Sequence, residues 1–435
     1  MSASPHPPRF KFKSFARYQD RYESVTAIYY PNGWKSSTYC RWWVKIMIKL
    51  SWGARSPSPD YDHGLRSQTQ LEELFKAIDL DQIELLRDTV TKITFEPTAF
   101  TLDPIFIPIR EGFNNHDNPY IASLPEMTYE IEEDERRIQH PAIDQVQISD
   151  IPLFENSRDL KCFGCIDESV FKVQIGEQDY IYKSIMGVHF EPEDTQNFLD
   201  EIAVLAKFRG YPNIAQIAGL VKSKDPYTTD RSAEIPSVLT GFLLEYSPGC
   251  TLQDLISDPE EWQPVDGLQV MKWAIQIGTA LESMHKNGCT HIGLKPQNIM
   301  IDEDDNAGGF DFQWNWLGVT KPGSLDFDSE ENALLVDVGG TGEFDRNWLP
   351  WEITSRFQVW DPENTLAKLP FERRVALDCW TYGKLLSVLV PEGAPADVLE
   401  MVASGLMTMD PGVQSSLSDS LAILKKNKHE MENWI

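Results

Sequence analysis

The chain has 435 residues, a formal net charge of −28 and 41% hydrophobic residues. This hydrophobic content excludes a wholly disordered chain, and the length predicts two or three domains. The acidic balance argues against nucleic acid as a partner, because phosphate binding requires a basic surface. No apolar run reaches the ~20 residues of a membrane helix, so no transmembrane segment is expected. Six cysteines do not make a disulfide framework in a chain of this length, and reduced thiols predict an intracellular, cytoplasmic protein.

The first 66 residues are basic and rich in proline and serine. They show no sustained period of 3.6 or 2 residues, which predicts a poorly ordered extension (1–66) rather than a packed element. A segment that docks on a partner or on an anionic membrane is the alternative interpretation.

Residues 67–150 predict a small accessory α+β region with an acidic linker. The spacing of Thr69 and Glu72 fits a capping box and predicts the start of a helix. The apolar residues between Ile83 and Val90 indicate further helical turns. Two short strands and the acidic linker are expected at 93–95, 105–109 and 130–135, respectively.

Signals of regular structure become dense from residue 151. Three apolar runs predict strands, and the i, i+4, i+7 spacing of Phe198, Ile202 and Leu205 predicts a helix. The three runs are Leu160–Phe163, Ser169–Ile175 and Asp179–Ile185. Further along the chain, an amphipathic helix ends before Thr290, and the apolar run Ile299–Asp302 predicts a strand.

Between that helix and that strand lies Thr-His-Ile-Gly-Leu-Lys-Pro-Gln-Asn, residues 290–298. This stretch resembles the catalytic loop of the protein-kinase superfamily, whose pattern is His-Arg-Asp-x-Lys-x-x-Asn. The resemblance implies a catalytic role for Lys295 and a metal-binding role for Asn298. Gly293 stands where the family has the aspartate that takes the proton of the accepting hydroxyl, so the general base is missing.

Other stretches resemble family motifs in the same order. Tyr180–Lys183 is similar to the strand Val-Ala-Ile-Lys, whose lysine binds the ATP phosphates. The resemblance implies that Glu201, on the predicted helix, pairs with Lys183. It also assigns nucleotide binding to Gly164, the one glycine kept from a glycine-rich loop, and to residues of the strand and hinge where adenine docks. Those further residues are Ile181, Leu244, Glu245 and Tyr246.

The run Val-Asp-Val-Gly resembles the kinase Asp-Phe-Gly motif and implies that Asp337 binds magnesium. An acidic insert, 303–332, separates it from the catalytic loop; its alternating aromatic residues predict a strand that packs on its own domain or presents a ledge to a partner. The stretch that begins at Asp378 resembles the start of the buried helix that anchors the lower lobe. Gln414 takes the place of the arginine that would pair with Glu352.

The resemblance implies an α+β, bilobal fold, with a small β-rich N-lobe at 151–246 and a helical, trimmed C-lobe at 247–430. The run Val-Asp-Val-Gly-Gly-Thr-Gly and Trp348 resemble divergent kinase-like proteins that filamentous fungi encode in many copies. We expect a pseudokinase or very weak kinase that binds ATP and magnesium and acts through a protein partner. The alternatives are an active serine/threonine kinase using Asp302 or water as its base, a kinase fold with other nucleotide chemistry, and a nucleotide-free scaffold. The oligomeric state stays open.

Overall fold

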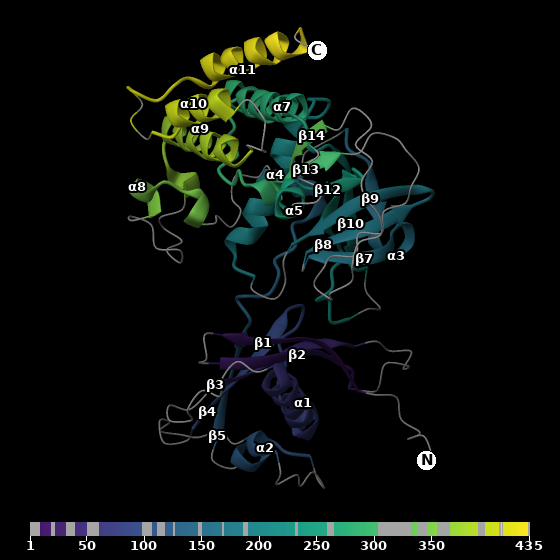
Figure 1. Cartoon of the computed structure of the whole chain (residues 1–435). Coiled ribbons are helices and arrows are strands. Elements are labelled where there is room, and N and C mark those ends of the chain that lie inside the picture. Colours follow the sequence, from purple (N-terminus) through teal and green to yellow (C-terminus); the bar gives the residue numbers. More distant parts are fainter. Residues whose placement is uncertain are drawn as a thin grey trace. The chain divides into compact units, whose positions relative to one another are not determined.

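The computed structural model places helices and strands in a mixed α+β arrangement, with sheets toward the N-terminus and helices toward the C-terminus (Figure 1). This fold class agrees with the one predicted from the sequence. The described residues are 9–18, 22–31, 40–49, 61–97, 107–110, 118–124, 127–146, 150–167, 169–185, 190–230, 234–258, 265–302, 332–336, 346–354, 366–389, 396–408, 410 and 412–433.

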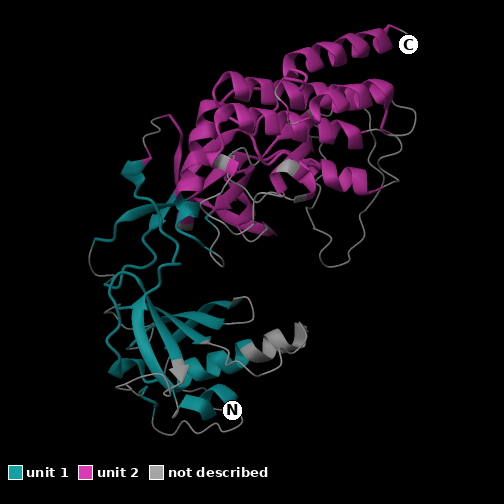
Figure 2. Ribbon diagram, turned by 90° about the vertical axis from the view of Figure 1, so that its left-hand side faces the viewer, with its two compact units in different colours: residues 1–145, 185–195, 222–240 teal, residues 146–184, 196–221, 241–435 magenta. Residues whose placement is uncertain are grey.

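The chain divides into two compact units, shown in different colours in Figure 2. Unit 1 consists of Met1–Gln145, Ile185–Thr195 and Lys222–Thr240. Unit 2 consists of Val146–Ser184, Gln196–Val221 and Gly241–Ile435. Unit 1 therefore takes in two connections that interrupt unit 2 along the sequence.

Unit 1 contains a five-stranded sheet in the order β1-β2-β3-β4-β5. All neighbours are antiparallel except β3 and β4, which are parallel and are joined through helix α1, as a parallel connection requires. The elements are β1 (Phe10–Tyr18), β2 (Tyr22–Tyr29), β3 (Trp42–Lys49), α1 (Tyr61–Ala77), η1 (Leu80–Gln82), β4 (Val90–Pro97), α2 (Pro119–Ser123), β5 (Met127–Glu133) and η4 (Ile143–Gln145).

Helix α1 packs on one face of this sheet. Its apolar residues recur at helical spacing, at Leu71, Leu74 and Phe75, and all three are fully buried. They share one core cluster with strand residues such as Ile46 and Ile93. Burial of this apolar face is the main source of stability for the sheet and the helix.

Residues 10–18, 22–29 and 42–49 differ from the sequence-based expectation, because they form three strands instead of a poorly ordered extension. A β-bulge between Phe12 and Ser14 shifts the register of β1 and breaks its period of two. Strand β2 is buried on both faces, so it shows no alternation of polar and apolar residues. Both features remove the pattern by which a strand is recognised.

Three further expectations for the accessory region are corrected by the structure. Helix α1 already begins at Tyr61, upstream of the Thr69 capping-box spacing. Val90 begins strand β4 rather than continuing a helix. The acidic run at 130–135 is largely strand β5, whose neighbour β4 supplies its hydrogen-bond partners, and not a linker.

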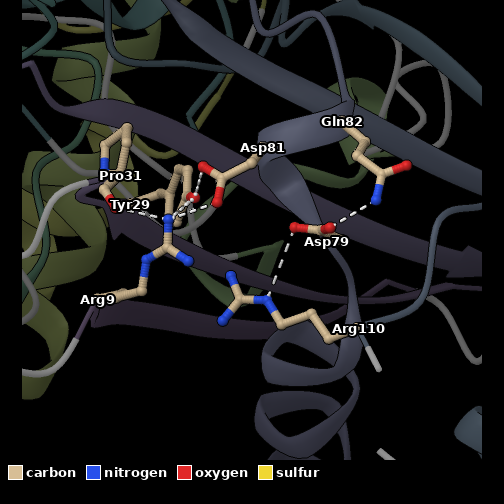
Figure 3. A network of polar contacts seen from close by, with 7 residues as sticks. All are labelled: Arg9, Tyr29, Pro31, Asp79, Asp81, Gln82 and Arg110. Carbon is tan, nitrogen blue, oxygen red and sulfur yellow. Dashed lines mark hydrogen bonds and ion pairs between the residues drawn. The ribbon is translucent and has the colours of Figure 1, made fainter. Parts of the chain in front are cut away.

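A polar network fastens the start of β1 to the rest of unit 1 (Figure 3). The Arg9 guanidinium donates to the Tyr29 hydroxyl and to Asp81, both at 2.6 Å, and the Tyr29 hydroxyl also bonds Asp81. Burial favours the protonated form of Asp81, but the hydrogen bonds from Tyr29 and Arg9 outweigh it and lower the pKa of the carboxyl. Nearby, Arg110 lies 4.0 Å from Asp79. The network joins β1, the end of β2, η1 and the segment at 107–110.

Unit 2 contains a six-stranded sheet in the order β6-β10-β11-β9-β8-β7, and the far ends of β10 and β11 belong to unit 1. The three strands and the helix predicted between residues 160 and 207 are all present. The elements are β6 (Leu153–Glu155), α3 (Asn156–Asp159), β7 (Lys161–Asp167), β8 (Val170–Ile175), β9 (Gln178–Ser184), α4 (Glu193–Lys207), β10 (Ile217–Lys224) and β11 (Ser237–Glu245).

The rest of unit 2 is helical, with a three-stranded sheet in the order β12-β13-β14. Helices α7 and α9 form its centre, where the buried Tyr382 hydroxyl donates to the Ala274 carbonyl at 2.6 Å. Among the described residues, no helix has the length and apolar character needed to cross a membrane. The elements are β12 (Gly249–Thr251), α5 (Leu252–Ser257), α7 (Gly267–Lys286), η5 (Pro296–Asn298), β13 (Ile299–Asp302), β14 (Asn332–Leu335), η7 (Arg346–Trp348), α8 (Trp351–Thr354), η9 (Leu366–Lys368), α9 (Phe371–Val388), α10 (Ala396–Leu406) and α11 (Leu417–Glu432).

Candidate functional site

Strand β9 and helix α4 bring Lys183 and Glu201 together. The Lys183 Nζ lies 2.8 Å from Glu201 Oε1, and their side chains are 22% and 9% exposed. Helix α4 is held against the sheet by apolar contacts such as that between the rings of Phe198 and Phe242, 5.4 Å apart. The predicted ion pair is therefore present, while the nucleotide-binding roles of the two residues stay a prediction.

The strand register places other predicted site residues on the same face of the sheet as Lys183. Lys183 lies opposite Phe242 of β11, and Ile181 lies opposite Leu244. Side chains two residues apart on a strand share a face, as do side chains directly opposite each other on neighbouring strands. Ile181, Lys183 and Leu244 therefore share the face that α4 covers.

At the end of β11, Tyr246 of the predicted hinge contacts a lysine that was not predicted from the sequence. The Lys172 Nζ lies 4.1 Å from the centre of the Tyr246 ring and 3.2 Å from Asp179. Burial lowers the pKa of Lys172, but its hydrogen bonds with Asp179 and Tyr246 outweigh that effect, so the pKa is raised. Lys172, on β8, lies opposite Ile181 of β9, and no local pattern in the sequence predicts this pairing. Glu245 is exposed.

The segment that resembles a glycine-rich loop is a hairpin of β7 and β8. Gly164 lies opposite Lys172, and Asp167 lies opposite Val170, close to the tip. A Cβ added to Gly164 would meet no atom within 4 Å, so packing does not require a glycine there. Val170 is in turn opposite Lys183, so the hairpin tip lies beside the strand that carries the lysine. The phosphate-binding role of Gly164 stays a prediction.

The loop at 290–298 is held by Asp378 of helix α9. This carboxylate is fully buried and accepts hydrogen bonds from the backbone N–H groups of His291 and Ile292, at 2.8 and 2.7 Å. It also lies 2.9 Å from His285 Nε2. Ile292 has a φ of 59°, a conformation that a β-branched residue adopts only when its surroundings impose it. Asp378 supplies that constraint.

Asn298 joins the end of the loop to Gly293 in its middle and to the residue after β14. Its Nδ2 donates to the Gly293 carbonyl at 2.9 Å, and its backbone carbonyl accepts from Val336 N at 3.1 Å. His291 Nε2 lies 3.1 Å from the Val336 carbonyl. The loop is therefore fixed to the residue that follows β14 and precedes Asp337 in the sequence.

Asp337 itself lies outside the described residues, as do residues 303–331 of the acidic insert. The metal-binding roles of Asn298 and Asp337 stay predictions. Within the part of the chain that the structure describes, no group of three or more histidine, cysteine or acidic side chains could hold a metal ion.

The position of the missing base has room for a side chain. A Cβ added to Gly293 would lie 3.6 Å from Asn298 Nδ2 and 3.8 Å from His291 Nδ1, both ordinary contacts. The backbone of Gly293 is also not in the left-handed region that favours glycine. Nothing in the packing of the described residues therefore requires glycine here. Lys295, the other predicted catalytic residue, is half-buried directly before η5.

The turn that follows α4 is hydrogen-bonded to β14. Leu335 N donates to the Asn213 carbonyl at 3.0 Å, and Ala215 N donates to the Leu335 carbonyl at 2.9 Å. The Asn213 side chain also donates to the Ala333 carbonyl at 2.9 Å. Through these bonds, the helix that carries Glu201 is connected to the strand that contacts the loop at 290–298.

Gln414, which replaces the expected arginine, has a structural role of its own. Its side-chain amide donates to the carbonyls of Ala376 and Leu406, both at 2.9 Å. These bonds join α9 to α10. The side chain of Glu352 lies outside the described residues.

Comparisons with known proteins point to one family. A model of the protein kinase domain matches residues 169–315, about a third of the chain. A probable serine/threonine-protein kinase of Clostridium acetobutylicum is 37% identical over 70 residues, 16% of this chain and 10% of that protein. The MAPK/MAK/MRK overlapping kinase of Mus musculus is 25% identical over 152 residues, 34% of this chain and 33% of that protein. Serine/threonine-protein kinase PrkC of Bacillus subtilis is 30% identical over 102 residues, 23% of this chain and 13% of that protein.

The matched segment contains Lys183, Glu201 and the loop at 290–298, and it ends before Asp337. The chain spans about a tenth to a third of the length of the relatives named above. The fold, the family model and these relatives support placing the chain in the protein-kinase superfamily, as a protein-kinase-like protein.

Proposed function

We propose that this chain is a nucleotide-binding pseudokinase, or a very weak kinase, that acts through a protein partner. The observation that carries the proposal is the contrast between two parts of one site. Lys183 is held by Glu201 at 2.8 Å, as phosphate binding requires, whereas Gly293 has no carboxylate to accept a proton. Fold alone does not establish activity, so the proposal depends on this contrast.

The proposal divides the binding of ATP and magnesium among the predicted site residues. Lys183 and Lys295 supply positive charge for the phosphates, and Ile181 and Leu244 supply apolar surface for the base. Asn298 and Asp337 would hold magnesium, which neutralises phosphate charge when it is bound. The relationship to fungal-type kinase-like proteins and a cytoplasmic location remain part of this proposal.

An active serine/threonine kinase with another base is the second candidate, and the position of Asp302 argues against its simplest form. Asp302 ends β13, whereas Asn298 precedes that strand and contacts Gly293. At ~3.3 Å per strand residue, the backbone of Asp302 lies about 10 Å from that of Ile299. The length of β13 thus separates the backbone of Asp302 from Asn298 at the end of the loop.

Binding of Mg-ATP to the full chain tests the proposal. We expect a saturable rise in the melting temperature of the wild type with Mg-ATP, and a loss of that rise in Lys183→Ala. The exposed substitution Lys426→Ala, on α11, is the matched control and should keep the response. No shift in the melting temperature at millimolar nucleotide would indicate a nucleotide-free scaffold. Transfer of a nucleotidyl group, detected by mass spectrometry, would indicate a kinase fold with other nucleotide chemistry.

A further inference from the structure

Unit 1 contains a cavity that has no part in the kinase-like site. Its volume is about 600 Å³, which lies in the range of small-molecule binding sites. The cavity is lined by Asp88, by Glu133, Glu135 and residues 137–140, by Pro192 and by two residues of the β10–β11 connection, Asp225 and Tyr227. All of these residues belong to unit 1.

The walls of the cavity are fixed by contacts that span long stretches of the sequence. Asp88 N donates to the Thr229 hydroxyl, and Thr229 N donates to Asp88 Oδ1, both at 2.8 Å. Asp88 has a φ of 56°, so this reciprocal pair holds a conformation that non-glycine residues rarely adopt. The Trp43 indole N–H donates to the Pro226 carbonyl at 2.7 Å. The cavity is thus built by the folded unit.

Aromatic surface forms one side of the cavity. The Tyr227 ring stacks on the His140 ring at 6.1 Å and meets the Trp43 ring edge-on at 5.3 Å. His140 Nδ1 is buried and has no hydrogen-bond partner among the described residues. His140 also lines the cavity, so its ring is part of this aromatic surface.

The charged groups that line the cavity are mainly acidic. Among the described residues that line the cavity, the carboxylates of Asp88, Glu133, Glu135 and Asp225 stand against the guanidinium of Arg137. Arg137 is already paired with Glu133 at 2.6 Å. Such a surface repels anions and attracts cations, and a cation close to an aromatic face gains further attraction.

We propose that this cavity binds an organic cation through a guanidinium or primary ammonium group, with Asp225, Glu135, His140 and Tyr227 as its contacts. The group could belong to a small amine or guanidine or to the side chain of a partner peptide, since the recognition chemistry is the same. This inference is independent of the proposed nucleotide site.

Calorimetric titration of the full chain at low ionic strength tests the inference. The probes are spermidine, arginine amide, and a short peptide containing either arginine or the uncharged citrulline. We expect saturable binding of the cationic probes and none of the citrulline peptide. Tighter binding of the arginine peptide than of arginine amide would identify a protein partner as the source, and the reverse order would identify a small metabolite.

Two variants test whether the cation binds in this cavity. Asp225→Asn keeps an oxygen to accept the bond that Tyr227 N makes with Asp225 at 2.9 Å, and it should weaken binding about tenfold. Glu135 is exposed, so Glu135→Gln leaves the fold intact and should weaken binding about twofold to threefold. The exposed Glu84, outside the cavity, provides the control Glu84→Gln, which should bind like the wild type.

Absence of saturable heat with every cationic probe up to about 10 mM would overturn the inference, because a dissociation constant above that concentration is too weak for a specific site. Equal weakening by Glu84→Gln and Glu135→Gln would also overturn it, since binding would then reflect only the general negative charge of the surface.

Discussion

Replacement of Asp378 by asparagine should destabilise unit 2 far more than the loss of one charge suggests. The carboxylate is fully buried and serves three donors, the N–H groups of His291 and Ile292 and the ring of His285. In Asp378→Asn, one carboxylate oxygen becomes an NH₂ group that faces donors, so at least one buried N–H loses its acceptor.

The expected cost follows from these contacts. An unsatisfied buried N–H costs about 1–3 kcal/mol, and hydrogen bonds to a charged acceptor are stronger than those to a neutral one. The remaining bonds must also hold Ile292 at its φ of 59°. We therefore expect a loss of about 2–4 kcal/mol in the free energy of unfolding of unit 2.

Urea unfolding followed by tryptophan fluorescence measures this loss, because Trp273 is fully buried in unit 2. Asp397→Asn, on the exposed side of α10, is the matched control and should change stability by less than roughly 0.5 kcal/mol. If Asp378→Asn were as stable as this control, Asp378 would not be what holds the loop, and the reasoning would be refuted.

Two further predictions concern packing and pH. A Cβ at Gly278 would lie 2.6 Å from the Tyr382 hydroxyl, so Gly278→Ala should lower the free energy of unfolding by about 1–3 kcal/mol. Gly164→Ala, with open space around the added Cβ, should be tolerated. Equal melting temperatures for the two variants would contradict this difference in packing. Burial lowers the pKa of His140 below its ordinary value of 6.5, although Asp225 opposes the shift. Below that pH the unfolded chain binds a proton that the folded chain does not, so the stability of unit 1 should fall as pH drops from about 6.5, and His140→Gln should remove this component. Identical pH profiles for the variant and the wild type would exclude the effect.

The sequence predicted those strands and helices whose apolar residues recur with a clear local pattern. The strands at 161–184 and helix α4 contain apolar runs that the sequence shows, although bulges interrupt β7, and the order of motifs was enough to pair Lys183 with Glu201. The resemblance to kinase motifs grouped residues that are far apart in the sequence into one site, which composition and periodicity do not do.

The features that sequence reasoning missed depend on long-range contacts or on broken periodicity. The bulge in β1 and the two-sided burial of β2 hide strands that the sheet nevertheless forms. The pairing of Asp88 with Thr229 joins residues 141 positions apart, and no local pattern indicates it. Likewise, Lys172 joins the hinge only because the hairpin places it opposite Ile181.

The most direct test of the central claim is the rate at which phosphate is transferred from labelled Mg-ATP, compared between the wild type and Gly293→Asp. The added side chain fits, because its Cβ would meet only ordinary contacts, and a general base typically contributes about 10²- to 10⁴-fold. The account predicts transfer at or near background in the wild type and a gain of that order in Gly293→Asp, lost again when Lys183→Ala is added. Transfer in the wild type at the same rate as in Gly293→Asp, or none in either chain, would contradict it.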